Sequence, residues 1–214
     1  MEIEVKVPNG KSGDWTVGEI EVKSNDFGQM IRMAQTGRGV PGGIYKRLIR
    51  KGTTVMSNTP DEIRDFSYFL YKAKGGILIH GLGIGVLVVA LLEKEDITDI
   101  TIIEKSKDVL NLSAATYENH PKVTIIHADC FEWESPKNKR YGAVWHDIWD
   151  NITSDNLEEM KKLHRKYGRK ADYQESWCRH ICERERREEK EEERWHSMMY
   201  PQINPFDEKD LKLV

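Results

Sequence analysis

Cysteine and long apolar runs are scarce in this 214-residue sequence, and no targeting signal is evident. The three cysteines, an odd number, do not make a disulfide framework and suit a reducing compartment. The longest nearly uncharged stretch, residues 75–92, is interrupted by His80 and by glycines and is too short to span a bilayer. The N-terminal residues MEIEVKVPNG contain neither a basic leader nor an apolar signal core. We therefore exclude membrane-spanning, secreted and fibrous classes and expect a cytoplasmic protein.

A dominant charge of one sign is also lacking. The formal net charge is −3, so no overall basic field attracts the chain to nucleic acid. Much of the polarity comes from Glu183 to Arg194, twelve consecutive charged residues, of which seven are Glu and five are Arg or Lys. Their mixed signs at helical spacing favour a solvent-exposed helix over a disordered tail. The remainder is an ordinary core-forming sequence, long enough for one sizeable domain.

Three zones follow one another along the chain. Residues 1–58 are β-like and rich in turns, because apolar and charged residues alternate and Asn-Gly and Gly-Asp pairs interrupt them. Residues 59–170 begin with Thr59-Pro60-Asp61-Glu62, which predicts the start of a helix. The Thr59 hydroxyl would cap this helix, and the Glu62 side chain would reach back to Thr59. Residues 171–214 contain a predicted long helix, from about Ala171 to Met199, and a short tail.

The middle zone alternates predicted strands with predicted helices. Four short apolar runs indicate buried strands, at Ile77–His80, Ile100–Ile103, Val123–His127 and Ala143–His146. Strands that are apolar on both faces and are joined by helices require a parallel sheet covered on both sides. The sequence therefore predicts an α/β fold: a Rossmann-like, mostly parallel sheet with helices on both faces, a small β-rich N-terminal segment and a helical C-terminus.

The first of these strands leads into three alternating glycines, Gly81, Gly83 and Gly85, before a helix begins. Glycine allows sharp turns and a close approach of the backbone to a ligand, and a helix start offers free N–H groups. The spacing is G-x-G-x-G, since Val86 stands where a dinucleotide fingerprint has its last glycine. Taken alone this signal is weak, because a glycine-rich turn without a ligand has the same pattern.

Polar residues follow the other three strands at their carboxyl ends. Glu104 ends the second strand, where a carboxylate can accept hydrogen bonds from both hydroxyls of a ribose. Asp129 and Cys130 follow the third strand, where a carboxylate and a backbone N–H can recognise adenine. Residues 145–150, WHDIWD, follow the fourth strand. Open α/β sheets bind ligands at this edge, so the coincidence of the four clusters predicts a nucleoside site.

These segments resemble the motifs of the class I S-adenosylmethionine-dependent methyltransferase fold, including its spermidine synthase branch. The resemblance covers about residues 45–150: ILIHGLGIG resembles the first motif, IIEKS the ribose-binding acid, IIHADCF the adenine-binding strand end and YGAVWHDIWD the fourth motif. The preceding stretch, LIRKGTTVMSNTPDEIRDFSYFLYKAKG, is similar to the same region of spermidine synthases. The resemblance implies S-adenosylmethionine as the cofactor.

The resemblance also implies roles for individual residues. By position, the residues implied to bind the cofactor are Gly81, Leu82, Gly83, Gly85, Glu104, Lys105, Asp129, Cys130 and Asp147. Asp147 is the first candidate for taking or orienting the proton of the acceptor, with His146 and Asp150 behind it. Neighbouring residues on a strand point to opposite faces, so we do not expect both His146 and Asp147 to face the ligand.

The sequence also departs from the family pattern. Ile79 and Ile84 stand where many methyltransferases and the aminopropyltransferases, respectively, carry an acid. After Asp150 the sequence is typical of helix, so we expect the final strand hairpin of the family to be absent and the sheet to be shortened. Three functions stay open: a methyltransferase of unknown acceptor, a spermidine synthase-like aminopropyltransferase, and a non-catalytic nucleoside-binding or interaction protein of the same fold.

A small-molecule or polyamine-like substrate is the first expectation for a partner, and a homodimer stays open. Nucleic acid is a weaker alternative, supported by the run KLHRKYGRK at 162–170 and by a basic N-terminal cluster of Arg32, Arg38, Lys46, Arg47, Arg50 and Lys51. We expect no membrane contact. Cys178 and Cys182 lie four residues apart, but no fourth ligand has zinc-site spacing, so we expect no metal site.

Overall fold

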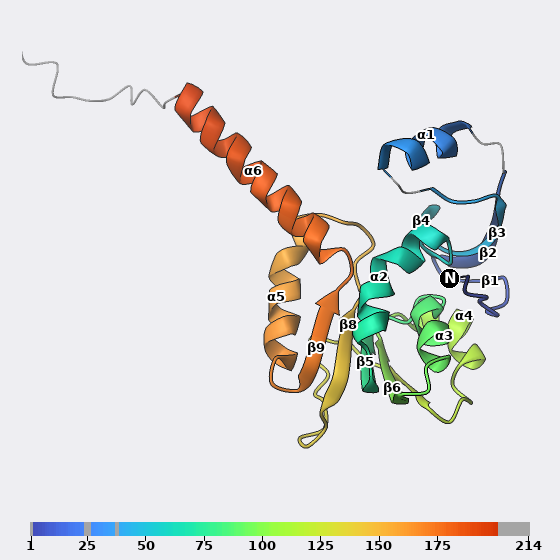
Figure 1. The fold of residues 1–214 in the computed structure, drawn as a ribbon. Coiled ribbons are helices and arrows are strands. Elements are labelled where there is room, and N and C mark those ends of the chain that lie inside the picture. The colour runs from blue at the N-terminus through green and yellow to red at the C-terminus, as the bar shows by residue number, and fades with distance from the viewer. Residues whose placement is uncertain (1, 24–26, 37–38, 201–214) are drawn as a thin grey trace, which may run out of the picture.

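A parallel five-stranded sheet forms the centre of the computed structural model, which describes residues 2–23, 27–36 and 39–200 (Figure 1). Its strands are β5 (Gly75–His80), β6 (Ile97–Glu104), β7 (Val123–His127), β8 (Tyr141–His146) and β9 (Ala171–Ser176). All neighbouring pairs are parallel, and the order across the sheet is β7-β6-β5-β8-β9. Counted from β5, this is the order 3-2-1-4-5 of a Rossmann-like sheet. The predicted α/β fold is confirmed.

Helices cover both faces of this sheet because its central strands are apolar on both sides. α2 (Pro60–Lys72) precedes β5. The helices between the strands are α3 (Val86–Leu92), α4 (Lys107–Ser113), which continues into a 3-10 turn at Ala114–Thr116, and α5 (Asn156–Tyr167). Ile77 and Ile79 of β5 belong to the core that α2 and α3 share, whereas Leu78 between them packs with α5. This alternation gives the molecule two cores, one on each face of the sheet.

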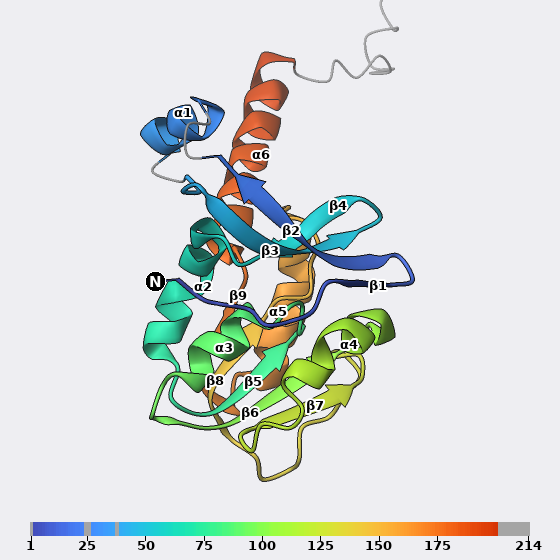
Figure 2. The same cartoon turned by 90° about the vertical axis from the view of Figure 1, so that its right-hand side faces the viewer.

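A second, antiparallel sheet lies above the carboxyl edge of the parallel one (Figure 2). Its strands pair in chain order: β1 (Gly10–Ser12), β2 (Trp15–Val22), β3 (Gly43–Arg50) and β4 (Thr53–Ser57). The β-rich N-terminal segment is thus confirmed, although it also contains a helix that was not predicted, α1 (Phe27–Thr36). Ahead of β1, Ile3, Val5 and Val7 are buried and alternate with exposed charged residues.

The region after residue 170 differs from its prediction. The long helix expected from Ala171 begins only at Arg179, as α6 (Arg179–Met199), and the preceding residues form β9. The prediction that the region after Asp150 is entirely helical is therefore wrong, since β9 pairs with β8 from Tyr141↔Ala171 to His146↔Ser176. In the described residues the sheet ends at β9, with no strand hairpin after it. β9 is an edge strand with partly exposed side chains, so its sequence lacks the apolar run that marks a strand buried on both faces. No helix in the described ranges is both long and apolar enough to cross a membrane.

α2 begins where the sequence predicts it, but the hydrogen bonds of its first turn are not those of the predicted capping box. Glu62 does not reach back to Thr59; it accepts hydrogen bonds from the backbone N–H and the hydroxyl of Ser57, at the end of β4. Burial raises the pKa of Glu62 to about 8. The glutamate of the expected capping box therefore links α2 to the N-terminal sheet.

Candidate functional site

A cavity of about 590 Å³ opens at the carboxyl ends of the central strands. The predicted site residues that line it are Gly81, Gly83, Glu104, Lys105, Asp129, Cys130, Asp147 and Asp150. The N-terminal sheet supplies the facing wall, with Trp15, Leu48, Arg50, Val55 and Met56. Cavities that bind small ligands have volumes of roughly 300–1,000 Å³. The cavity is thus large enough for a nucleoside-derived cofactor.

The glycine loop lies in close contact with other parts of the chain, among them Asp147 and Met56. Gly81, Gly83 and Gly85 have φ angles of 92°, 53° and 74°, in the left-handed region that favours glycine. A Cβ on Gly81 would lie 2.0 Å from the carbonyl oxygen of Asp147, and one on Gly83 would lie 2.3 Å from the sulfur of Met56. The loop therefore tolerates no side chain at these two positions without rearrangement.

Glu104 connects the glycine loop to the end of β6. Its carboxylate accepts a hydrogen bond from the N–H of Leu82 at 2.8 Å on one oxygen and from the N–H of Ser106 at 2.7 Å on the other. The side chain is only 8% exposed, and this burial raises its pKa while the backbone N–H groups act in the opposite direction. Each carboxylate oxygen has a further lone pair, so both can still accept a hydrogen bond from a ligand hydroxyl.

Asp129 and Cys130 lie at the next strand end and differ in character. Asp129 forms an ion pair with Lys105 at 2.8 Å and accepts the N–H of Phe131 at 2.9 Å, and the bond from Lys105 lowers its pKa. Cys130 is buried, and burial raises the pKa of its thiol to about 12. The aspartate is thus a fixed anionic acceptor, whereas the cysteine thiol is a neutral packing group.

Asp147 is an acid of the cavity lining whose pKa is raised toward neutral pH. Burial raises its pKa to about 7, the indole N–H of Trp145 at 3.5 Å lowers it, and the charges of Asp65 and Glu104 raise it. Asp150 lies at the rim in an ion pair with Arg50 of the facing wall. A carboxyl group with such a pKa can gain and lose a proton under physiological conditions.

His146 lies outside the cavity lining, on the face of the sheet covered by α5. It is fully buried, and its Nδ1 is 2.8 Å from Nδ1 of His80. The ring of His164 is 5.2 Å away, centroid to centroid, and the amide oxygen of Gln174 accepts a hydrogen bond from Nε2 of His146 at 3.4 Å. The structure thus brings Asp147 but not His146 to the cavity. Leu82 and Gly85 also lie outside the cavity lining. The backbone N–H of Leu82 donates to Glu104, and Gly85 is the N-cap residue of α3.

This histidine cluster should make the stability of the fold depend on pH. Burial lowers the pKa of His80 to about 3 and that of His164 to about 4, below the ordinary value of 6.5. The unfolded chain therefore binds protons that the folded chain excludes, and each histidine removes up to about 1.4 kcal/mol of stability per pH unit below about pH 6.5.

Urea unfolding of the wild type and of His164→Gln at several pH values between 7 and about 4 measures this effect. Asp147 and Glu62, whose raised pKa values act in the opposite direction, are present in both proteins and cancel in the comparison. We expect the stability advantage of the wild type to shrink as the pH falls. Parallel curves for the two proteins would contradict the buried, neutral state of His164.

The facing wall contains the residues that the sequence analysis missed. The N–H of Ile84 points to the sulfur of Met56 at 3.4 Å, and the guanidinium of Arg50 lies 5.1 Å from the ring centre of Trp15. These residues come from the N-terminal sheet, and Trp15 has no motif or periodicity to connect it with the glycine loop. Arg50 and Met56 lie in the stretch at 48–75 that resembles spermidine synthases, but that resemblance assigned neither of them a role in the site.

Three of the four members of the basic N-terminal cluster whose side chains the structure describes are paired with acids. Lys46 pairs with Glu19 at 2.9 Å and Lys51 with Asp14 at 3.5 Å, in addition to the pairing of Arg50 described above. Arg38 and the side chain of Arg32 lie outside the described residues. Within the described residues, no three His, Cys, Asp or Glu side chains are grouped so that they could hold a metal ion.

No model of a known protein family matches the chain, and no curated protein matches it. Among solved structures, it is similar to spermidine synthase from Thermotoga maritima, with 14% identity and a TM-score of 0.43 over 73% of this chain and 52% of that one. It is also similar to an S-adenosylmethionine-dependent methyltransferase from Clostridium acetobutylicum, with 13% identity and a TM-score of 0.38 over 52% of this chain and 44% of that one. A third similar structure is the N-methyltransferase NodS from Bradyrhizobium japonicum in complex with S-adenosyl-L-homocysteine, with 9% identity and a TM-score of 0.39 over 50% of this chain and 56% of that one.

The chain thus matches about half the length of each of these proteins. At such identities the likeness concerns the fold alone. The strand order and the glycine loop after β5 make the fold Rossmann-like, as the sequence predicted. Conclusions about activity depend on the cavity itself.

Proposed function

We propose that this chain is an S-adenosylmethionine-dependent methyltransferase that acts on a small-molecule acceptor. The observation that carries the proposal is the convergence of Gly83, Glu104, Asp129 and Asp147 on one cavity. They follow four neighbouring strands at the edge where open α/β sheets bind ligands. In the proposed complex, Glu104 accepts from the ribose hydroxyls, the segment at Asp129 holds adenine, and the glycine loop faces the methionine part.

In methyl transfer the protein mainly has to position the methyl donor and the acceptor relative to each other. Bound S-adenosylmethionine supplies a methyl group on a positively charged sulfur, and the chain orients the acceptor toward it. An amine or hydroxyl acceptor must also lose a proton. Asp147, with a pKa of about 7, suits this role, because part of it is ionised at neutral pH and can take up the proton. Asp150, at the rim and paired with Arg50, is placed to orient the acceptor.

One observation favours a second candidate, an aminopropyltransferase. The cavity lining includes two basic side chains, Arg50 and Lys105, and seven acidic ones: Asp14, Glu104, Asp108, Asp129, Asp147, Asp150 and Glu159. Both basic groups are already paired with an acid of the lining. Decarboxylated S-adenosylmethionine, the aminopropyl donor, has no carboxylate to be repelled by these acids. A polyamine-like acceptor would also be attracted to them.

Isothermal titration with the two donors separates the candidates. For a methyltransferase we expect tighter binding of S-adenosylmethionine than of its decarboxylated form. The reverse preference would support the aminopropyltransferase, and absence of binding by both would support a non-catalytic protein of this fold. Methionine alone is the matched control, since it lacks the adenosine that Glu104 and Asp129 are proposed to hold.

A further inference from the structure

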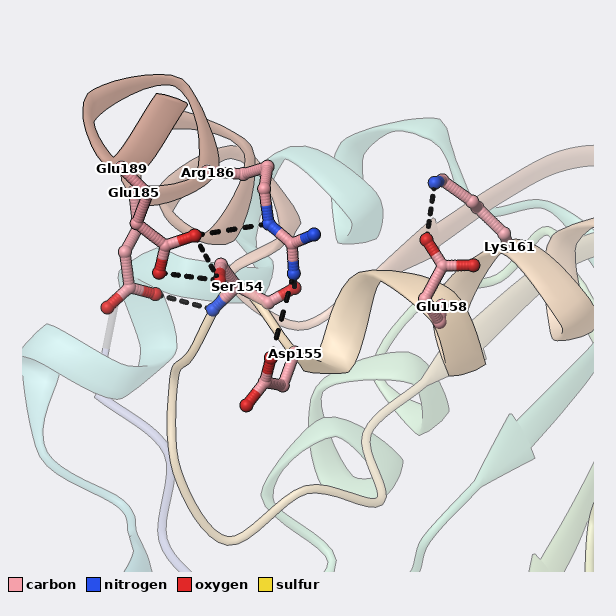
Figure 3. Close-up of polar contacts among 7 residues, drawn as sticks. All are labelled: Ser154, Asp155, Glu158, Lys161, Glu185, Arg186 and Glu189. Carbon is pink, nitrogen blue, oxygen red and sulfur yellow. Dashed lines mark hydrogen bonds and ion pairs between the residues drawn. The ribbon is translucent and has the colours of Figure 1, made fainter. Parts of the chain in front are cut away.

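The first half of α6 is fixed to the body of the protein through Ser154 (Figure 3). Ser154 is 2% exposed and lies in the loop between β8 and α5. Its N–H donates to Glu185, its hydroxyl donates to Glu189 at 2.8 Å, and its carbonyl accepts from Arg186 at 3.0 Å. Cys182 of the same helix is fully buried. These contacts set the direction in which the helix leaves the molecule.

The second half of α6 projects away from the body (Figures 1 and 2). Every residue from Arg187 to Tyr200 is exposed. Three large apolar side chains are nevertheless gathered near its end: Trp195 is 60% exposed, Met198 72% and Met199 58%. Their spacing of three and four residues places them on one side of the helix, which we call the Trp195 face. Such a cluster at the end of a polar helix indicates a contact surface.

The net charge of α6 is positive in its first half and negative in its second half. Residues 179–187 contain four arginines and two glutamates, whereas residues 188–199 contain five glutamates, one lysine and one arginine. Steps of three and four residues connect Trp195 to Glu192, Glu191 and Glu188 and further to Arg187 and Arg184 on the same face, where Glu188 is paired with Arg184 of its own helix. The Trp195 face is thus basic near the body, acidic further out and apolar at its end.

We propose that a second copy of this chain pairs with α6 in the antiparallel sense along the Trp195 face. In this arrangement Glu191 and Glu192 of each copy lie opposite Arg184 and Arg187 of the other. A twofold axis relates the two copies, so each of these charge pairs is formed twice. A parallel pairing would instead put acid beside acid. The inference is independent of the function proposed above.

The antiparallel arrangement also covers the apolar end of each helix. Trp195, Met198 and Met199 of one copy come to lie beside the first turns of the other copy's α6. A 21-residue helix is about 31 Å long, so the contact is small and the dimer is weak. Because charge pairs contribute to it, the dimer should weaken when salt is added.

Sedimentation velocity of the full chain over a range of concentrations tests the proposal. We expect a monomer–dimer equilibrium whose dissociation constant rises with salt, and at least about a tenfold further rise in Arg184→Glu/Arg187→Glu. Adding Glu191→Arg and Glu192→Arg to that variant reverses the polarity of the face and should restore association. Lys161→Glu/Lys162→Glu on the exposed side of α5 changes the net charge equally and should have no such effect.

Circular dichroism of each variant shows whether α6 stays helical, since Arg184 also pairs with Glu188 at 3.8 Å within the helix. A wild-type chain that stays monomeric at every concentration would overturn the proposal. So would a dimer that the first charge reversal leaves unchanged while the helix is intact. Restoration by the four-substitution variant distinguishes pairing of two α6 helices from a dimer formed elsewhere on the surface.

Discussion

Gly81→Ala should lower the free energy of unfolding by roughly 3 kcal/mol or more and abolish binding of S-adenosylmethionine. Gly81 has a φ angle of 92°, which an alanine adopts only with strain. In addition, the new Cβ would lie 2.0 Å from the carbonyl oxygen of Asp147, an atom of the backbone that cannot turn away as a side chain would. Relieving this overlap moves the glycine loop away from the end of β8. Chemical denaturation and calorimetric titration measure the two effects.

Gly52→Ala is the matched control for this substitution. Gly52 also has a positive φ angle, 87°, but a Cβ there would meet nothing within 4 Å. We expect a loss of about 1 kcal/mol from the backbone strain and unchanged binding. If both variants lose the same stability and both still bind the cofactor, the close approach of β5 and β8 does not shape the site as described.

Glu104→Gln should weaken binding of S-adenosylmethionine by about 5- to 150-fold, which corresponds to about 1–3 kcal/mol. The carboxylate accepts N–H groups from Leu82 and Ser106 on its two oxygens. An amide offers one oxygen and directs its NH₂ group at the second N–H donor, so it loses that bond and the charge that strengthens hydrogen bonds from the ribose. Calorimetric titration of the variant measures the loss.

Glu118→Gln, an equivalent change at an exposed position, should leave the affinity unchanged. A thermal melt of each variant shows that binding is measured on folded protein, because Glu104 also supports the glycine loop. Wild-type affinity in a folded Glu104→Gln variant would mean that the ribose is not bound at this carboxylate.

The strands that carry the site were predictable because of where they lie in the sheet. β5, β6, β7 and β8 begin and end within a few residues of the predicted ranges, since interior strands covered on both faces need uninterrupted apolar residues. β9 was missed for the opposite reason. It lies at the edge of the sheet, and its six residues ADYQES include four polar or charged side chains besides Tyr173. The charged helix that follows led to the prediction of a helix over the whole region.

The candidate site was predictable where its residues follow strands and unpredictable where they come from elsewhere. Glu104, Asp129 and Asp147 line the cavity because the carboxyl ends of parallel strands meet at one edge. Met56 and Trp15 reach it because the N-terminal sheet folds over that edge, a tertiary contact with no local pattern in the sequence. The alternation of side chains along β8 correctly indicated that His146 and Asp147 point to different faces.

A crystal structure of the chain with S-adenosylhomocysteine tests the central claim most directly. We predict density in the cavity with the ribose hydroxyls within hydrogen-bond distance of both oxygens of Glu104, the adenine beside Asp129 and the sulfur facing Asp147. A ligand bound with its ribose away from Glu104, or a cavity that remains empty at saturating ligand, would contradict the account.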